Sequence, residues 1–242
     1  MIRINKYLSQ CGVASRRSAD LMVTEGRVTV NGEVITTPGH MVNEEADQVA
    51  VDGRPVAPTS RHVYIILNKP AGYVTSRSDP HHKRTVMELL KDLPDRVNPV
   101  GRLDLDTTGV LLFTNDGELA HRLTHPRFEV IKVYRAKVAG DVSKAQALIL
   151  SGGVALPDGA IGRAQASIEG AGDGYTVLQL ELTEGRKREV KHLCKAIGHP
   201  VIALNRRSFA GIEAAGLEIG KWRHLTPAEV DQLRRLVKLD AG

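Results

Sequence analysis

The spacing of apolar residues along the first 56 positions predicts a small domain of helices and short strands. Ser15 is a favourable helix N-cap, and Ala19, Met22 and Val23 behind it share one helix face. Asn31-Gly32 stands between two alternating segments, which is the strongest short-range signal of a β-hairpin. The expected elements are helices at 5–11 and 15–25 and strands at 28–30, 33–34 and 49–51. We therefore expect an independent domain at residues 1–58, followed by a linker.

From Val63 onward the pattern predicts a second, larger domain, which we place at residues 61–242. Continuous apolar runs at Val63–Leu67 and Val110–Phe113 indicate buried strands. The alternation at Val177–Leu182 indicates a strand with one buried face. Further expected elements are a strand at 130–138 and helices at 118–125, 143–150, 190–197 and from Pro227 onward.

Composition and charge narrow the possible functions. Hydrophobic residues make up 42% of the 242 positions and charged residues 25%, which is typical of a globular protein with a real core. The net charge of +5 favours a polyanionic partner. An aromatic content of only 4% argues against a protein that binds single strands mainly by stacking.

Metal, cofactor and membrane signals are weak throughout the sequence. Cys11 and Cys194 lack the spacing of metal ligands, and His121 and His125, although spaced i, i+4, lack the remaining ligands of a zinc site. There is no glycine-rich nucleotide-binding motif, so we expect neither a cofactor nor a metal. The first residues lack the apolar core of a signal peptide, and we expect a cytoplasmic protein without a membrane partner.

A short charged segment precedes the strand at 110–113. Arg102, Asp104 and Asp106 lie between Gly101 and Gly109, at the entrance to that strand. Asp side chains of this kind can simply form turns and pair with a neighbouring Arg. Alternatively, one carboxylate acts as a nucleophile or a base in a cleft. The spacing alone does not decide between these readings or between the two Asp residues.

The densest cationic segment runs from Thr183 to Arg207 and holds seven Lys or Arg against two Glu. Arg186 and Arg188 are its first candidates for following a phosphate backbone. In the first domain, Lys6, Arg16 and Arg17 form either a solvated face or a set of phosphate contacts.

Several motifs resemble those of the bacterial ribosomal RNA pseudouridine synthases. Gly101-Arg102-Leu103-Asp104, followed by Asp106-Thr107-Thr108-Gly109 and an apolar strand, is similar to the catalytic motif of that family. The segments that resemble its other motifs are 68–72, 132–134 and 183–198. The resemblance implies that Asp104 is the catalytic residue, that Tyr134 lies against the target uracil, and that Lys191 pairs with Asp104. Lys191 stands where other branches have Arg, so it supplies a point charge without a bidentate fork.

The first domain resembles the α-L RNA-binding domain at residues 3–8, 14–17 and 30–32. Together the resemblances imply an α+β fold. The small α-L domain would precede a catalytic domain built on a mixed, mainly antiparallel sheet with flanking helices and a central cleft. They also imply ribosomal RNA, naked or in a pre-ribosomal particle, as the partner of a monomeric enzyme. The residues expected to contact RNA are Lys6, Arg16, Arg17, Arg102, Arg186 and Arg188.

Four dipeptides are most similar to the branch that modifies a single large-subunit site. They are Thr75-Ser76, Asp79-Pro80, Thr85-Val86 and Pro99-Val100. The small-subunit branch remains an alternative. A function of a different class, a non-catalytic RNA-binding factor in ribosome assembly, also remains open.

Overall fold

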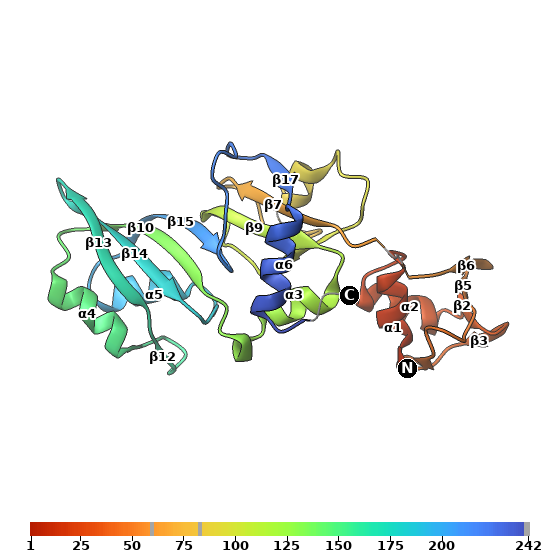
Figure 1. Ribbon diagram of the computed structural model, residues 1–242. Helices are drawn as coiled ribbons and strands as arrows, with labels where there is room; N and C mark the ends of the chain where they lie inside the picture. Colours follow the sequence, from red (N-terminus) through yellow and green to blue (C-terminus); the bar gives the residue numbers. More distant parts are fainter. Residues whose placement is uncertain (59–60, 82–83, 240–242) are drawn as a thin grey trace. The chain divides into compact units, whose positions relative to one another are not determined.

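The structure is a computed structural model that describes residues 1–58, 61–81 and 84–239. The described chain divides into two compact units, drawn in Figure 1. The N-terminal unit consists of Met1–His62 with the short segment Asn115–Gly117, and the rest of the described chain forms the second unit.

Two helices and two small sheets make up the N-terminal unit. Its elements are β1 (Ile2–Arg3), α1 (Ile4–Gln10), α2 (Arg16–Thr24), β2 (Val28–Val30), β3 (Glu33–Ile35), β4 (Met41–Val42), β5 (Val49–Val51) and β6 (Arg54–Val56). Strands β3-β2-β5-β6 form one antiparallel sheet, and β1 pairs with β4.

Local sequence signals set the ends of these elements as predicted. Ser15 is the N-cap of α2, and its hydroxyl accepts a hydrogen bond of 3.1 Å from the N–H of Ser18. Asn31 and Gly32, with φ of 52° and 86°, join β2 to β3 in the left-handed conformation that a tight hairpin turn requires. Both the helix cap and the hairpin are therefore confirmed.

A nine-stranded sheet organises the second unit. Its strands are β7 (Tyr64–Lys69), β8 (Asn98–Val100), β9 (Thr108–Thr114), β10 (Lys132–Ala139), β13 (Gln165–Gly172), β14 (Tyr175–Leu182), β15 (Val201–Phe209), β16 (Ile212–Glu213) and β17 (Trp222–His224). The order is β13-β14-β10-β15-β9-β7-β17, with β16 beside β15 and β8 beside β9. Among the described strands of this sheet, all neighbours are antiparallel except β15 and β9, so the expected mixed, mainly antiparallel sheet is confirmed.

The parallel contact between β15 and β9 joins the two parts of this sheet. It is short, with Asn205 opposite Thr108 and Arg206 opposite Gly109. Gly109 has φ of 102°, and a Cβ built on it would lie 2.9 Å from the Arg206 nitrogen and closer still to the Arg206 carbonyl oxygen. Glycine is therefore required here, because any side chain would push the two strands apart.

Helices cover both parts of the sheet. They are α3 (Gly117–Thr124), α4 (Lys144–Gly152), α5 (Glu189–Ala196) and α6 (Pro227–Leu236), with 3₁₀ helices at Val86–Leu90 and Pro126–Phe128 and a small β11 (Val154–Ala155) to β12 (Ile161–Gly162) pair. In Figure 1, α4 lies beside β13 and α5 beside β14, whereas α3 and α6 lie beside β9.

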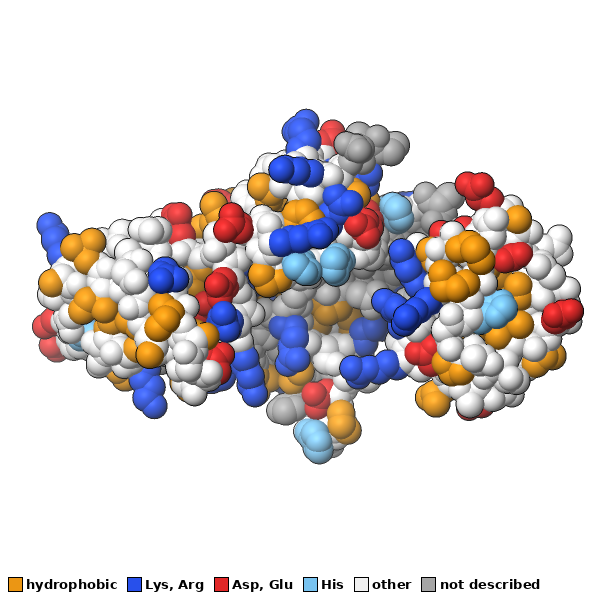
Figure 2. All heavy atoms as spheres, turned by 90° about the horizontal axis from the view of Figure 1, so that it is seen from below, with side chains coloured by type: hydrophobic (Ala, Val, Ile, Leu, Met, Phe, Trp, Pro, Cys, Tyr) orange, Lys and Arg blue, Asp and Glu red, His pale blue; other side chains and the backbone are white. Residues whose placement is uncertain are grey.

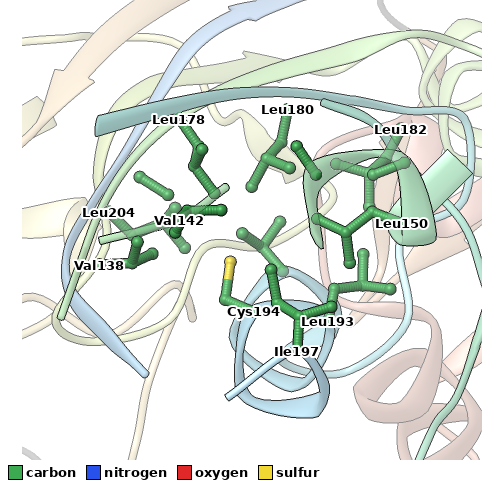
Figure 3. Close-up of a cluster of buried hydrophobic side chains, with 14 of the residues drawn as sticks. Val138, Val142, Leu150, Leu178, Leu180, Leu182, Leu193, Cys194, Ile197 and Leu204 are labelled. Atoms are coloured by element: carbon green, nitrogen blue, oxygen red, sulfur yellow. The ribbon is translucent and has the colours of Figure 1, made fainter. Parts of the chain in front are cut away.

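The core between α5 and the sheet fixes the orientation of that helix. Figure 3 shows Leu193 and Cys194 of α5, and Ile197 directly after it, pointing towards Leu178 and Leu180 of β14. Leu193 and Cys194 are fully buried, as the apolar spacing of 190–197 predicts. Because this face is buried, the residues on the other side of α5 are held in a defined direction.

One strand boundary departs from the sequence prediction. We expected a strand from Val130, but β10 begins at Lys132. Glu129 has φ of 47°, and the carbonyl of Ile131 accepts a hydrogen bond from Ala210 outside the β10 ladder. The chain thus turns before it joins the sheet, which an apolar pattern does not reveal. Across the described residues, no helix combines the length and apolarity that crossing a membrane requires.

Candidate active site

A cavity of about 520 Å³ in the second unit brings together several of the candidate residues. Its wall is formed by the loop before β9, by β10, by the segment between β14 and α5, and by β15. The candidates that line it are Arg102, Asp104, Tyr134, Arg186, Arg188 and Lys191. Candidate residues that are far apart in the sequence therefore line the same cavity.

The loop that carries Asp104 is held from behind by Lys69, a residue with no solvent exposure. Its ammonium donates hydrogen bonds to the main-chain carbonyls of Pro70, Asp104, Leu105 and Thr107, at 3.0, 3.1, 3.4 and 2.9 Å. The loop is thereby fixed through its backbone, and the Asp104 side chain is left to face the cavity.

A second anchor lies just before Asp104. The Thr75 hydroxyl donates to the carbonyl of Leu103 at 2.8 Å and accepts from the N–H of Leu103 at 3.2 Å. Thr75 and Leu103 are both buried. Backbone groups in such a loop have few alternative partners, so these bonds restrict its conformations.

Lys191 and Arg188 bring positive charge to the Asp104 carboxylate. Lys191 Nζ lies 3.4 Å from Asp104 Oδ2, and Arg188 Nη1 lies 3.8 Å from the same oxygen. The Lys191 hydrogen bond goes to Asp106 Oδ1 at 2.5 Å. Sequence reasoning foresaw no role for Asp106 and considered pairing with Arg102, whereas the cations at these carboxylates come from the α5 region.

Burial and charge shift the pKa values of three groups around the loop. The hydrogen bond from Lys191 holds the pKa of Asp106 below its usual range. Burial lowers the pKa of Lys69 to about 8, against the opposing pull of Asp106 and Asp104. Burial likewise lowers the pKa of Lys132, another residue of the cavity wall, to about 8.

Tyr134 enters the cavity wall from β10, where the ladder with β15 is irregular. Val133 pairs with Ser208 but Tyr134 pairs with Arg206, so Arg207 is an extra residue on β15. Bulges of this kind change the direction of neighbouring side chains. The Tyr134 ring is half-buried and packs against two of the apolar clusters of the second unit.

Two of the predicted RNA-contacting residues already have acidic partners. Arg186 lies 2.6 Å from Glu184 and 3.6 Å from Asp158. Arg188 is the N-cap of α5, with φ of 55°, and faces Asp104 as described above. Figure 2 shows Asp and Glu side chains among the Lys and Arg side chains on one face of the second unit.

Buried polar atoms without a hydrogen-bond partner concentrate at this cavity. Among the described residues, Thr107 Oγ1, Glu189 Oε1 and Arg206 Nη2 are three of the four such atoms, and all three residues line it. Such atoms are rare in folded proteins and retain an unused capacity for hydrogen bonding.

Sequence reasoning gave no role to five polar residues behind or within the cavity wall. They are Lys69, Thr107, Lys132, Glu189 and Arg206. Lys69, Thr107, Lys132 and Glu189 lie in segments that resemble family motifs, and this resemblance was the signal that could have singled them out.

The residues of the N-terminal unit that were expected to contact RNA lie on its helices. Lys6 on α1 and Arg16 and Arg17 at the start of α2 are exposed. Arg16 Nη2 donates to Asn5 Oδ1 at 3.5 Å, and Asn5 in turn donates to Asp20 at 3.0 Å. Arg16 and Arg17 therefore place two positive charges on the first turn of α2, an end of a helix that also attracts anions.

The histidine pair of the sequence acquires no further metal ligand. The rings of His121 and His125 lie 5.3 Å apart on and after α3. Within residues 1–58, 61–81 and 84–239, no three His, Cys, Asp or Glu side chains gather as a metal site would require.

Comparisons with known proteins agree with this geometry. The RNA pseudouridylate synthase family model matches residues 63–196, and the S4 domain model matches residues 2–49. An RNA pseudouridine synthase of Aquifex aeolicus, named as uncharacterized, is 46% identical over 239 residues, which cover 98% of this chain and 96% of that protein.

Two further matches cover almost the whole chain. The ribosomal large subunit pseudouridine synthase B of Bacillus subtilis is 41% identical over 238 residues, with 98% of this chain and 97% of that protein covered. A crystal structure of a pseudouridylate synthase superimposes with a TM-score of 0.68 and 28% identity, over 96% of this chain and 100% of the other. The chain therefore belongs to the RNA pseudouridylate synthase family, a family of RNA-modifying isomerases, and carries an S4 domain at its N-terminal end.

Proposed function

We propose that this protein converts a specific uridine of large-subunit ribosomal RNA to pseudouridine, with Asp104 as the nucleophile. The observation that carries the proposal is the geometry of Asp104. Its backbone is anchored by Lys69, and its carboxylate faces a cavity beside Lys191 and Tyr134. The large-subunit target is supported by the name of the Bacillus subtilis relative.

The reaction requires one group that can bond to the nucleotide and later leave. The bond between N1 of uracil and C1′ of ribose breaks, a bond between C5 and C1′ forms, and the C5 proton is lost while N1 regains one. An ionised carboxylate can serve as such a covalent group. The ammonium of Lys191 lies 3.4 Å and the guanidinium of Arg188 3.8 Å from Asp104 Oδ2, so both place positive charge beside this carboxylate.

Tyr134 supplies a surface for the target base. A base in folded RNA must leave its stack before a protein can act on it, at a cost of a few kcal/mol. Stacking on an aromatic ring contributes about 1 to 3 kcal/mol. The unpaired polar atoms of Thr107, Glu189 and Arg206 suit a guest with both donors and acceptors, and a pyrimidine is such a guest.

Basic residues of both units would hold the RNA backbone. We assign phosphate contacts to Lys6, Arg16 and Arg17 in the S4 domain and to Arg102, Arg186 and Arg188 at the cavity. The domains would extend over residues 1–58 and 61–242. The enzyme would work as a cytoplasmic monomer, on naked RNA or on a pre-ribosomal particle.

Release of tritium from RNA labelled at C5 of uridine tests the reaction. Wild-type protein should release tritium from large-subunit ribosomal RNA, whereas Asp104→Asn should lose at least about 10³-fold in rate, as expected when a nucleophile is removed. Asp173→Asn, an exposed residue outside the cavity wall, is the matched control. Full activity of Asp104→Asn, or an inactive wild type on every ribosomal RNA, would contradict the proposal.

Mapping pseudouridines in cells with and without the gene identifies the target. We expect a single large-subunit site to disappear and to return with the wild-type gene but not with the Asp104→Asn gene. Loss of a small-subunit site instead would assign the enzyme to the other branch. If Asp104→Asn restored every phenotype, a non-catalytic role in ribosome assembly would replace the enzymatic one.

A further inference from the structure

Two carboxylates share the ammonium of Lys191, and its hydrogen bond goes to the one outside the cavity. Lys191 Nζ donates to Asp106 Oδ1 at 2.5 Å, whereas it lies 3.4 Å from Asp104 Oδ2 without a hydrogen bond of good geometry. Asp104 lines the cavity and its side chain is 31% exposed. Asp106 is 66% exposed and does not line the cavity, so it is not placed to touch a bound base.

The positions of all three side chains are restricted by their surroundings. The carbonyls of Asp104, Leu105 and Thr107, which flank Asp106, all accept hydrogen bonds from Lys69. On the other side, the Lys191 side chain is only 11% exposed and rises from α5, whose opposite face is packed in the core. The positions of Asp104, Asp106 and Lys191 relative to one another are therefore fixed by the anchored loop and by α5.

A hydrogen bond to a carboxylate has opposite effects on its ionisation and its reactivity. It stabilises the charged form. It also occupies a lone pair and lowers the basicity of the oxygen, and nucleophiles of lower basicity attack more slowly. A nucleophilic carboxylate is therefore most reactive when a cation lies near it but donates its hydrogen bond to another group.

We propose that Asp106 is a positioning residue that holds the Lys191 hydrogen bond, so that the Asp104 oxygens stay free to attack while the ammonium still lies beside them. This inference rests on the proposed role of Asp104. Without Asp106, the ammonium would turn to Asp104, the other carboxylate among the described residues that pairs with it, and bond to it directly. Arg188, at 3.8 Å from Asp104, would remain in place.

Kinetics of two Asp106 variants test the inference. In Asp106→Ala the value of kcat should fall by about tenfold, which matches the loss of one charge-assisted hydrogen bond. The KM for RNA should change by less than about twofold on that expectation, because Asp106 does not touch the base. Asp106→Asn keeps an oxygen that accepts from Lys191, so its kcat should lie between those of Asp106→Ala and wild type. Asp173→Asn again serves as the control.

An NMR measurement separates this inference from the proposed function. Scalar coupling across a hydrogen bond links the ¹⁵N of the Lys191 ammonium to the ¹³C of its carboxylate partner. We expect coupling to Asp106 in wild type and coupling to Asp104 in Asp106→Ala. Activity plays no part in this readout, so it remains decisive even if wild-type protein acts on no ribosomal RNA.

Three outcomes would overturn the inference. One is a kcat of Asp106→Ala within about twofold of wild type, which is smaller than the loss of any such bond. Another is a change in KM alone, which would make Asp106 an RNA-contacting residue. The third is an absence of coupling from Lys191 to Asp104 in Asp106→Ala.

Discussion

The buried ammonium of Lys69 donates a hydrogen bond of 3.1 Å to the main-chain carbonyl of Asp104. The same nitrogen reaches three further carbonyls around the loop. Lys69 does not line the cavity, so it acts on the reaction only through the backbone that carries the carboxylate. Its role is to place Asp104, and that role can be tested apart from the chemistry.

Replacement of Lys69 by Met should destabilise the second unit by about 3 kcal/mol, because buried carbonyls lose their donor. The value of kcat should fall by at least about tenfold at temperatures where the variant is still folded, because the loop loses its anchor. Urea unfolding and tritium release measure the two effects. Lys91→Met, at an exposed position, should change stability by less than about 0.5 kcal/mol. Equal unfolding midpoints for both variants would contradict the anchoring role.

The lowered pKa values of Lys69 and Lys132, each about 8, predict a pH dependence of stability. The unfolded chain has ordinary lysines with pKa of 10.5, so between about pH 8 and pH 10.5 it binds more protons than the folded chain. The free energy of unfolding should therefore rise with pH across this window. Below about pH 8 both lysines are charged in the folded and the unfolded chain, so they should add nothing to the pH dependence there.

Urea unfolding at a series of pH values checks this rise. Lys132→Met removes one of the two groups, so its unfolding free energy should increase less steeply between pH 8 and pH 10.5 than that of wild type. An identical slope in the variant would show that Lys132 titrates at its ordinary value.

Gly109→Ala should destabilise the protein by more than about 4 kcal/mol, because its Cβ would meet the backbone of Arg206 where β9 and β15 pair. Gly72→Ala provides a matched comparison. Gly72 also has a positive φ, of 85°, but nothing lies within 4 Å of its added Cβ. Its cost should be about 1 to 2 kcal/mol, from backbone strain alone. Chemical denaturation of both variants measures the difference, and similar midpoints would rule out the backbone clash.

The Tyr134 ring should matter more than its hydroxyl. Tyr134→Phe keeps the stacking surface, so its kcat/KM should remain within about threefold of wild type. Tyr134→Ala should lower kcat/KM by about 10- to 100-fold, which corresponds to the stacking energy of one base. Steady-state tritium release distinguishes the variants. If Phe and Ala were equally impaired, the hydroxyl rather than the ring would be the important group.

Sequence reasoning succeeded where the signal is local. The Ser15 cap, the Asn31-Gly32 turn and the buried face of α5 each follow from a few neighbouring residues. The loop with Asp104 was also recognisable, because Gly101 and Gly109 bound a charged segment before an apolar strand.

Long-range pairings were not predictable in the same way. An apolar pattern does not name the partner of a strand, so the parallel contact between β9 and β15 could not be foreseen. Lysine is usually found at the protein surface. Lys69 and Lys132 are buried instead, because main-chain carbonyls accept hydrogen bonds from each ammonium. The sharing of Lys191 between Asp104 and Asp106 depends on side-chain directions that spacing does not encode.

The short parallel contact between β9 and β15 has a mechanical consequence. Asp104 precedes β9, whereas Tyr134 lies on β10 and Lys191 on α5, which packs against the part of the sheet beyond β15. If the part of the sheet with β9 slid against the part with β15, Asp104 would move away from Lys191 and Tyr134. This would happen even if the strands within each part stayed paired. Cohesion of the sheet across this junction is thus a precondition for turnover.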